Sequence, residues 1–106
     1  METNTQTIIE NDVLRDLREP GMYAVILLND DITTMEFVIM LLMRVFHKQQ
    51  AEAEMLMMEI HQNGQGVAGI YTFDVAITKK TQADQLSAEK GYPLRITIET
   101  AERDAS

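Results

Sequence analysis

Residues 22–38 read MYAVILLNDDITTMEFV, and this stretch contains the main signals for the fold. Its first part, Met22 to Leu28, is a continuous apolar run rich in β-forming residues, which predicts a buried strand. Asn29, Asp30 and Asp31 follow, and their side chains favour a turn because they bond to nearby backbone groups. The stretch therefore predicts a strand and a turn, and its last residues have the pattern of a helix start.

That helix begins in a threonine-rich segment. Thr33 and Glu36 have the spacing of a capping box, in which Thr33 accepts a hydrogen bond from the Glu36 amide and the Glu36 side chain bonds back to Thr33. The helix is expected to run to about His47. Its apolar face has the i, i+3, i+4, i+7 pattern of a helix packed on a core, at Val38, Leu41, Leu42 and Val45.

A second helix and a second strand are expected next. Good helix formers dominate from Gln50 to Gln62, and Gly64 suits the left-handed conformation that ends many helices. The link between the two helices is short, so they should form a helical hairpin. Residues 66–77, GVAGIYTFDVAI, hold β-branched and aromatic residues with apolar alternation late in the run, which predicts a strand.

The last two elements complete the domain. Lys79 to Lys90 predicts a polar, amphipathic helix, and the alternation from Leu94 to Ile98 predicts a final strand. The order β-α-α-β-α-β predicts an α+β domain in which helices pack on one face of a three-stranded antiparallel sheet. This domain is expected to span residues 20–100, between an N-terminal extension of residues 1–19 and an acidic tail of residues 101–106.

Length and composition exclude several classes of protein. The chain has 106 residues, enough for one domain, and its net charge is −8. That charge argues against a nucleic-acid binder, which needs basic side chains for the phosphates. The absence of cysteine excludes a disulfide framework and fits a reducing compartment such as the cytoplasm. No apolar run is long enough to span a membrane, and no export signal is expected at the N-terminus.

The N-terminal extension differs in composition from the body of the chain. Residues 2–19 carry five acidic and two basic side chains, a net charge of −3. Apolar residues recur in it at loosely helical spacing, at Ile8, Ile9, Val13, Leu14 and Leu17. The extension is either a frayed terminus or an arm that engages a partner, and its composition is compatible with both.

Two groups of polar residues could form a functional site. Asn29, Asp30 and Asp31 lie at the junction of two rigid elements, where binding groups collect, although a solvated turn also explains them. His61 lies four residues after Met57 and so shares its helix face. A histidine near a helix C-terminus is commonly a surface group that compensates the helix dipole.

Methionine is concentrated in the two-helix unit. This flexible side chain either fills gaps in a core or lines adaptable apolar pockets. Six of the eight methionines belong to this unit: Met35, Met40, Met43, Met55, Met57 and Met58.

The sequence lacks the usual signatures of an enzyme. It has no glycine-rich phosphate loop, no G-x-S-x-G motif and no paired carboxylates in a catalytic pattern. A metal-dependent hydrolase using Asp30, Asp31 and His61 is one alternative, but the chain has neither an H-x-x-x-H pair nor a cysteine to support a zinc site. No metal site is therefore expected.

The stretch from residue 23 to residue 38 has the pattern Y-x-V-I-L-x-N-D-D-x-T-x-M-E-F-V, which resembles the ClpS family of Clp protease adaptors. Met57-x-x-x-His61 follows at the family's spacing, and the resemblance runs without a gap from about Pro20 to Glu99. It implies a compact ClpS-like domain, similar to the C-terminal domain of the ribosomal stalk protein.

The resemblance also implies a function. Such an adaptor recognises substrate proteins that begin with Leu, Phe, Tyr or Trp and delivers them to the AAA+ unfoldase ClpA, the partner of the ClpP protease. The protein would then be a cytoplasmic monomer without catalytic activity or cofactor. A different class stays open, namely a non-catalytic interaction module that has no preference for free N-termini.

The resemblance assigns roles to individual residues. Asn29, Asp30 and His61 would accept hydrogen bonds from the ammonium group of the substrate. Met35 would be a gatekeeper whose bulk excludes the β-branched side chains of Ile and Val. The apolar pocket would be lined by Leu28, Thr33, Met35, Val38, Met57 and Leu94.

The resemblance further implies a contact with the N-terminal domain of the unfoldase, through Asp74 and Lys79. Asp74 stands where Glu is more usual, which keeps the charge and shortens the reach. The N-terminal extension would help to transfer the substrate to the unfoldase.

Overall fold

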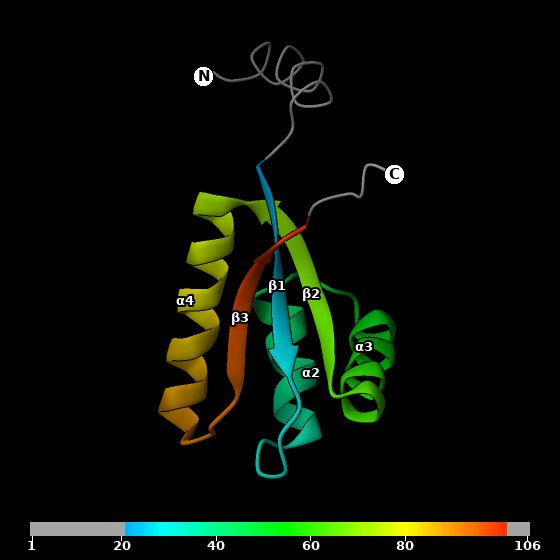
Figure 1. The fold of residues 1–106 in the computed structure, drawn as a ribbon. Coiled ribbons are helices and arrows are strands. Elements are labelled where there is room, and N and C mark those ends of the chain that lie inside the picture. Colours follow the sequence, from blue (N-terminus) through cyan, green and yellow to red (C-terminus); the bar gives the residue numbers. More distant parts are fainter. Residues whose placement is uncertain (1–20, 102–106) are drawn as a thin grey trace.

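The computed structural model describes residues 21–101 and has the predicted order of strands and helices (Figure 1). The elements are β1 (Met22–Leu28), α2 (Met35–Arg44), α3 (Gln50–Asn63), β2 (Gln65–Thr72), α4 (Phe73–Lys90) and β3 (Arg95–Thr100). The predicted extension, residues 1–19, and all of the predicted tail except Ala101 lie outside the described residues. No helix in the described range is long and apolar enough to cross a bilayer.

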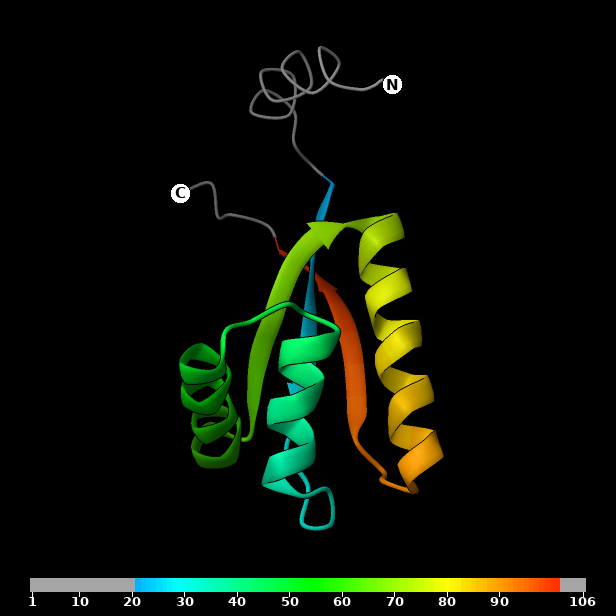
Figure 2. The same cartoon turned by 180° about the vertical axis from the view of Figure 1, so that it is seen from behind.

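The three strands form the predicted antiparallel sheet, in the order β2-β1-β3. β1 is therefore the central strand, and its pairing with β2 is shifted by a bulge between Val25 and Ile26. All three helices lie on one face of the sheet, with α2 between α3 and α4, as Figure 2 shows from the helix side. Val25 and Leu27 point into this layer and are fully buried.

The helix α2 begins one residue later than its capping-box spacing predicts. Thr34, not Thr33, is the N-cap, and its hydroxyl accepts a hydrogen bond from the Phe37 amide at 3.1 Å. The predicted box is wrong because Asp30 binds both the amide and the hydroxyl of Thr33. A threonine next to a turn aspartate can be part of the turn, which leaves the next residue to cap the helix.

The link between α2 and α3 starts earlier than predicted, because α2 ends at Arg44 and not near His47. His47 adopts a left-handed backbone conformation with φ of 58°. The Lys48 amide then bonds back to the Leu42 carbonyl at 3.1 Å. A left-handed residue is typical of a helix C-terminus, and this bond, which spans six residues, closes the turn that leads into α3. The predicted helical hairpin is confirmed, and Gly64 ends α3 with a φ of 91° as predicted.

The predicted strand over residues 66–77 is wrong in its second half. β2 ends at Thr72, and α4 starts at Phe73 rather than at Lys79. The side chains that suggested a strand by their alternation are solvent-exposed on the first turns of the helix: Phe73, Val75 and Ile77. The side chains that α4 buries are small and recur at helical spacing, which lets this helix approach the core closely: Ala76, Ala83 and Ser87.

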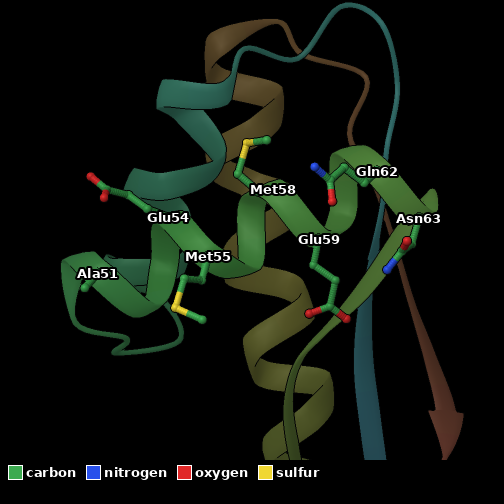
Figure 3. A pocket seen from close by; sticks show the side chains of 7 residues that line it. All are labelled: Ala51, Glu54, Met55, Met58, Glu59, Gln62 and Asn63. Atoms are coloured by element: carbon green, nitrogen blue, oxygen red, sulfur yellow. The ribbon is translucent and has the colours of Figure 1, made fainter.

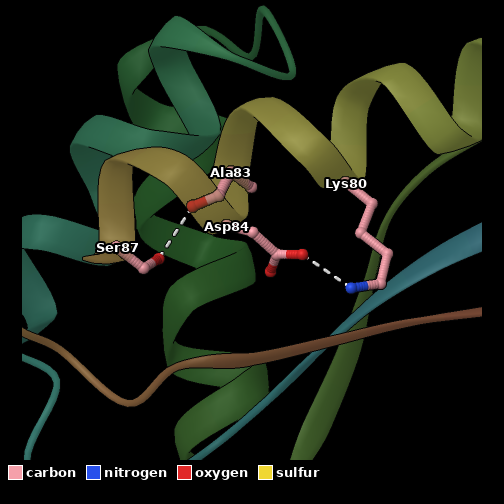
Figure 4. A network of polar contacts seen from close by, with 4 residues as sticks. All are labelled: Lys80, Ala83, Asp84 and Ser87. Carbon is pink, nitrogen blue, oxygen red and sulfur yellow. Dashed lines mark hydrogen bonds and ion pairs between the residues drawn. The ribbon is translucent and has the colours of Figure 1, made fainter. Parts of the chain in front are cut away.

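The middle of α4 is held by local polar contacts (Figure 4). Lys80 and Asp84 form an ion pair one turn apart, with 2.6 Å between Nζ and Oδ2. The buried Ser87 hydroxyl donates to the Ala83 carbonyl at 2.8 Å, so burial leaves no unpaired hydroxyl there. The buried polar side chain of α4, Ser87, is therefore hydrogen-bonded within the helix.

Candidate functional site

Three chain segments meet at the end of β1, which is the lower end of the molecule in Figure 1. Leu28, the last residue of β1, pairs with Gln65 of β2 on one side and Arg95 of β3 on the other. The loop after β1 therefore lies between the end of α3 and the segment that leads into β3. The backbone amide of Asn29 donates to the Gly64 carbonyl at 2.9 Å and connects the loop to the C-terminus of α3.

The loop is folded around the carboxylate of Asp30. Its Oδ1 accepts the amides of Ile32 at 2.8 Å and Thr33 at 2.7 Å, and its Oδ2 accepts the Thr33 hydroxyl at 2.8 Å. Burial by itself raises the pKa of this carboxyl, but the bonds from Thr33 and Ile32 outweigh it and hold the pKa below its ordinary value. Asp30 is thus ionised at neutral pH and fixes the loop conformation.

The polar residues predicted to bind an ammonium group lie around this junction. Asn29 is exposed beside the end of α3, and His61 is exposed in the last turn of that helix. Asp30, the residue after Asn29, is half-buried. Its carboxylate accepts three hydrogen bonds from within the loop. The bond from Asn29 to Gly64 joins two segments that are 35 residues apart in the sequence, so the structure brings Asn29 and the His61 turn into one region.

The predicted apolar residues differ in exposure. Val38, Met57 and Leu94 are each 7% exposed and belong to the hydrophobic core. Leu28 and Thr33 are half-buried, whereas Met35 is 43% exposed at the first residue of α2. Three of the predicted pocket residues are thus core side chains, and the other three keep solvent-accessible surface.

Two residues near this region were not predicted from the sequence. The Tyr92 ring packs against Phe37 of α2 with 5.0 Å between centroids, and the Thr34 hydroxyl donates to the Tyr92 hydroxyl at 3.4 Å. Tyr92 therefore holds the segment containing Leu94 against the start of α2. The signal was the aromatic residue itself, which lies between Gly91 and Pro93 in the link from the predicted helix to the predicted last strand.

Ile60 is the other unpredicted residue. It is buried in α3 next to His61, and a Cβ added at Gly66 would lie 2.8 Å from its Cγ1. Gly66 therefore lets β2 pass close to α3 directly after the turn at Gly64. This close approach fixes the position of the last turn of α3, which carries His61.

The two residues predicted to contact an unfoldase lie at the other end of the molecule. Asp74 is exposed in the first turn of α4. Lys79 is half-buried, and its ammonium donates to the Val45 carbonyl at the C-terminus of α2, at 2.8 Å. It also lies 5.8 Å from the centroid of the Tyr71 ring. A cation at a helix C-terminus is favourable, so Lys79 connects α4 to α2 in addition to any role in binding.

A shallow depression lies on the outer surface of α3, away from the sheet (Figure 3). The exposed side chains of Met55 and Met58 project there beside Glu54 and Glu59. The depression does not include the predicted pocket residues, because it is formed by residues on the opposite face of α3 from the core: Ala51, Glu54, Met55, Met58, Glu59, Gln62 and Asn63.

Within residues 21–101, no three His, Asp or Glu side chains are grouped so that they could hold a metal ion. The model of the family described as "ATP-dependent Clp protease adaptor protein ClpS" matches residues 18–97. The chain therefore belongs to the ClpS family, whose members are adaptors of the Clp protease and not enzymes.

Individual relatives support this assignment over most of the chain. The ClpS adapter protein of Acetivibrio thermocellus is 44% identical over 94 residues, which cover 89% of this chain and 95% of the relative. The ClpS adapter protein of Myxococcus xanthus is 43% identical over 101 residues, covering 95% and 94% of the two chains.

A solved structure also matches the fold. Agrobacterium tumefaciens ClpS2 bound to L-phenylalaninamide superposes with a TM-score of 0.74 at 39% sequence identity. The match covers 77% of this chain and 99% of the other. The predicted α+β architecture and the resemblance to ClpS are thereby confirmed.

The hydrogen bonds of Asp30 predict how the stability of the protein depends on pH. The Asp30→Asn variant should be less stable than the unchanged protein at neutral pH, because an amide cannot accept all three bonds as a carboxylate does. The pKa of Asp30 is lower in the folded protein than in the unfolded chain, where it is near 3.8. The stabilisation by the ionised carboxylate is therefore complete above the unfolded-state pKa and is lost as the pH falls through the lower folded-state pKa. Urea unfolding of both proteins should thus give free energies that converge as the pH falls below about 4.

The neighbouring Asp31→Asn variant is the matched control. Asp31 is exposed and forms no hydrogen bond within the described residues, so its replacement should change stability by less than about 0.5 kcal/mol. A difference between Asp30→Asn and the unchanged protein that stays constant from pH 7 to pH 3 would contradict the structural role of the carboxylate.

Proposed function

We propose that this chain is an adaptor for substrate proteins whose N-terminal residue is bulky and hydrophobic, namely Leu, Phe, Tyr or Trp. It delivers them to the N-terminal domain of a ClpA-type unfoldase, acting as a monomer in the cytoplasm. The observation that carries this proposal is the junction at the end of β1, where the backbone amide of Asn29 is bonded to Gly64, directly after the last turn of α3 that carries His61.

The chemistry of an N-terminal residue suits this junction. A free N-terminus is an ammonium group with three N–H donors, and it needs acceptors on the protein. The side-chain oxygen of Asn29 and a ring nitrogen of His61 are exposed and available for it. Hydrogen bonds to a charged group are worth about 1.5–3 kcal/mol each, so they give a large preference for a free N-terminus over an internal residue.

Asp30 has a different part in this proposal. A carboxylate offers about four lone-pair sites, and three bonds from Ile32 and Thr33 already use most of them. Its negative charge nevertheless persists, because those donors are neutral. We therefore assign to Asp30 the electrostatic attraction of the ammonium and the shape of the loop, with at most one direct bond.

The side chain of the first substrate residue would enter the apolar surface beside the ammonium site. Leu28, Thr33, Val38, Met57 and Leu94 would form its walls and floor, and burial of a Leu or Phe side chain there is worth about 1.5–3 kcal/mol. The complex of the A. tumefaciens relative supports this, since L-phenylalaninamide combines a free ammonium with a phenyl side chain, as an N-terminal Phe does.

The direct test compares peptides that differ only in their first residue and its amine. A peptide that begins with Leu or Phe should bind, and the same peptide with an acetylated N-terminus should bind at least about tenfold more weakly, because acetylation removes the charge and its hydrogen bonds. Fluorescence anisotropy with labelled peptides measures both. Equal affinities across first residues and amine states would instead indicate an interaction module without N-terminal specificity.

Met35 gives a test of the gatekeeper role. In Met35→Ala, peptides that begin with Ile or Val should gain affinity relative to those that begin with Leu, because the side chain at the start of α2 no longer obstructs a branched Cβ. Met43→Ala is the control, since Met43 is also an exposed methionine but lies near the other end of α2. The role is refuted if the ranking of first residues is the same in all three proteins.

The unfoldase contact can be separated from peptide binding, since Asp74 lies at the opposite end of the fold from Asn29. Asp74→Lys should weaken binding to the purified N-terminal domain of the unfoldase by about fivefold or more, as charge reversal at an interface does, and leave peptide affinity unchanged. Calorimetry measures both. Glu89→Lys, the same change at the other end of α4, should not affect unfoldase binding; equal losses in both variants would exclude a specific Asp74 contact.

A further inference from the structure

The depression on α3 exposes two methionine side chains to solvent. Met55 is 73% exposed and Met58 is 39% exposed, and both line the depression (Figure 3). Met55 is mostly uncovered by residues 21–101, whereas Met58 is more than half covered and keeps an exposed part. Methionine is flexible and polarizable, so a pair of exposed methionines on successive turns makes a surface that adapts to different apolar side chains.

This surface is continuous with the proposed ammonium site. Met58 and Glu54 lie three and seven residues before His61, so all three are on one face of α3. Gln62 and Asn63, the two residues that follow His61, line the depression, and Gly64, which follows Asn63, is bonded to Asn29. A peptide held by its N-terminus at this end of α3 can therefore continue along the outer face of the helix.

The charge of this face is negative. Helix α3 contains Glu52, Glu54 and Glu59 but no Lys or Arg. Glu52 is paired with Lys48 at 3.6 Å, whereas neither Glu54 nor Glu59 forms an ion pair with any residue of the described range. Glu54 accepts only a neutral hydrogen bond from Gln50, at 3.0 Å. The two carboxylates beside the methionines are thus open to a cationic partner.

These three observations together identify an occupant. We propose that the outer face of α3 binds the substrate segment that follows the N-terminal residue and favours Lys or Arg in that segment. The aliphatic stem of such a side chain would pack on Met55 and Met58 while its charged end reaches Glu54 or Glu59. This inference rests on the proposed function, because the N-terminus must first be held near His61. The extension of this chain is a poorer occupant, since residues 2–19 carry a net charge of −3.

The geometry of the helix indicates which substrate positions are concerned. Seven residues separate Glu54 from His61, a distance of about 10 Å along the helix axis. An extended peptide covers about 3.3 Å per residue and therefore reaches Glu54 about three residues beyond its first. The basic preference should apply to substrate positions 3 to 5.

The experiment uses four peptides on the full chain. Three begin with Leu and differ at positions 3 to 5, which are all Lys, all Gln or all Glu; the fourth is the Gln peptide with an acetylated N-terminus. The Lys peptide should bind about three- to tenfold more tightly than the Gln peptide at low salt, as expected for two exposed ion pairs. The Glu peptide should bind more weakly than the Gln peptide, and about 0.5 M salt should reduce both differences.

A pair of double variants separates the local effect from the charge of the whole protein. Glu54→Gln with Glu59→Gln should remove most of the preference for Lys, while Glu89→Gln with Glu99→Gln, the same charge change elsewhere on the domain, should keep it. The inference is overturned if the unchanged protein shows no preference for Lys, or if both double variants lose it equally.

The acetylated peptide keeps this inference separate from the proposed function. If acetylation does not weaken binding, the proposed function fails, and the inference fails with it. If acetylation abolishes binding but Lys, Gln and Glu peptides bind alike, only the role of the α3 face is refuted.

Discussion

The rest of the structure depends on the pairing of β1 with a neighbour on each edge. Its four central residues, Ala24 to Leu27, are all buried, and both ladders reach its last residue, Leu28. Antiparallel pairing requires β2 and β3 to begin where β1 ends. The segments that precede β2 and β3 must therefore meet the loop that follows β1, and the candidate site is the place where these three segments meet.

The local chemistry of the loop makes this meeting point rigid. A six-residue segment between a strand and a helix would ordinarily sample several conformations. The Asp30 carboxylate satisfies two backbone amides and a hydroxyl within it, and the Asn29 amide fastens it to α3. Acceptors held in place before a ligand arrives do not have to be ordered by binding, which favours affinity for a small group such as an N-terminus.

The fold also separates the two proposed contacts of an adaptor. The loop after β1 and the start of α4 lie at opposite ends of the sheet (Figure 1). Lys79 joins α4 to the end of α2 through the Val45 carbonyl at one end, and the bond from the Asn29 backbone amide to Gly64 joins the loop to α3 at the other. A substrate held at one end leaves the other accessible, and this arrangement supports the delivery that we propose.

The sequence predicted some elements well and failed at others, for identifiable reasons. β1 was predicted to the residue, because a continuous apolar run between turn residues has few other structures. The start of α4 was missed, because alternation at Phe73, Val75 and Ile77 imitates a strand, whereas the helical signal lay in the small side chains at Ala76 and Ala83. The N-cap was displaced from Thr33 to Thr34, since Asp30 competes for Thr33.

The sequence by itself determined the order of the elements, the α+β class and the ClpS family, because these depend on local apolar patterns and on a motif contiguous in the chain. Only the tertiary structure decided that Asn29 touches the end of α3, that Tyr92 supports α2, and that Met55 and Met58 face outward. Such facts depend on strand pairing and helix packing between residues far apart in the chain, and no local pattern encodes the distance between them.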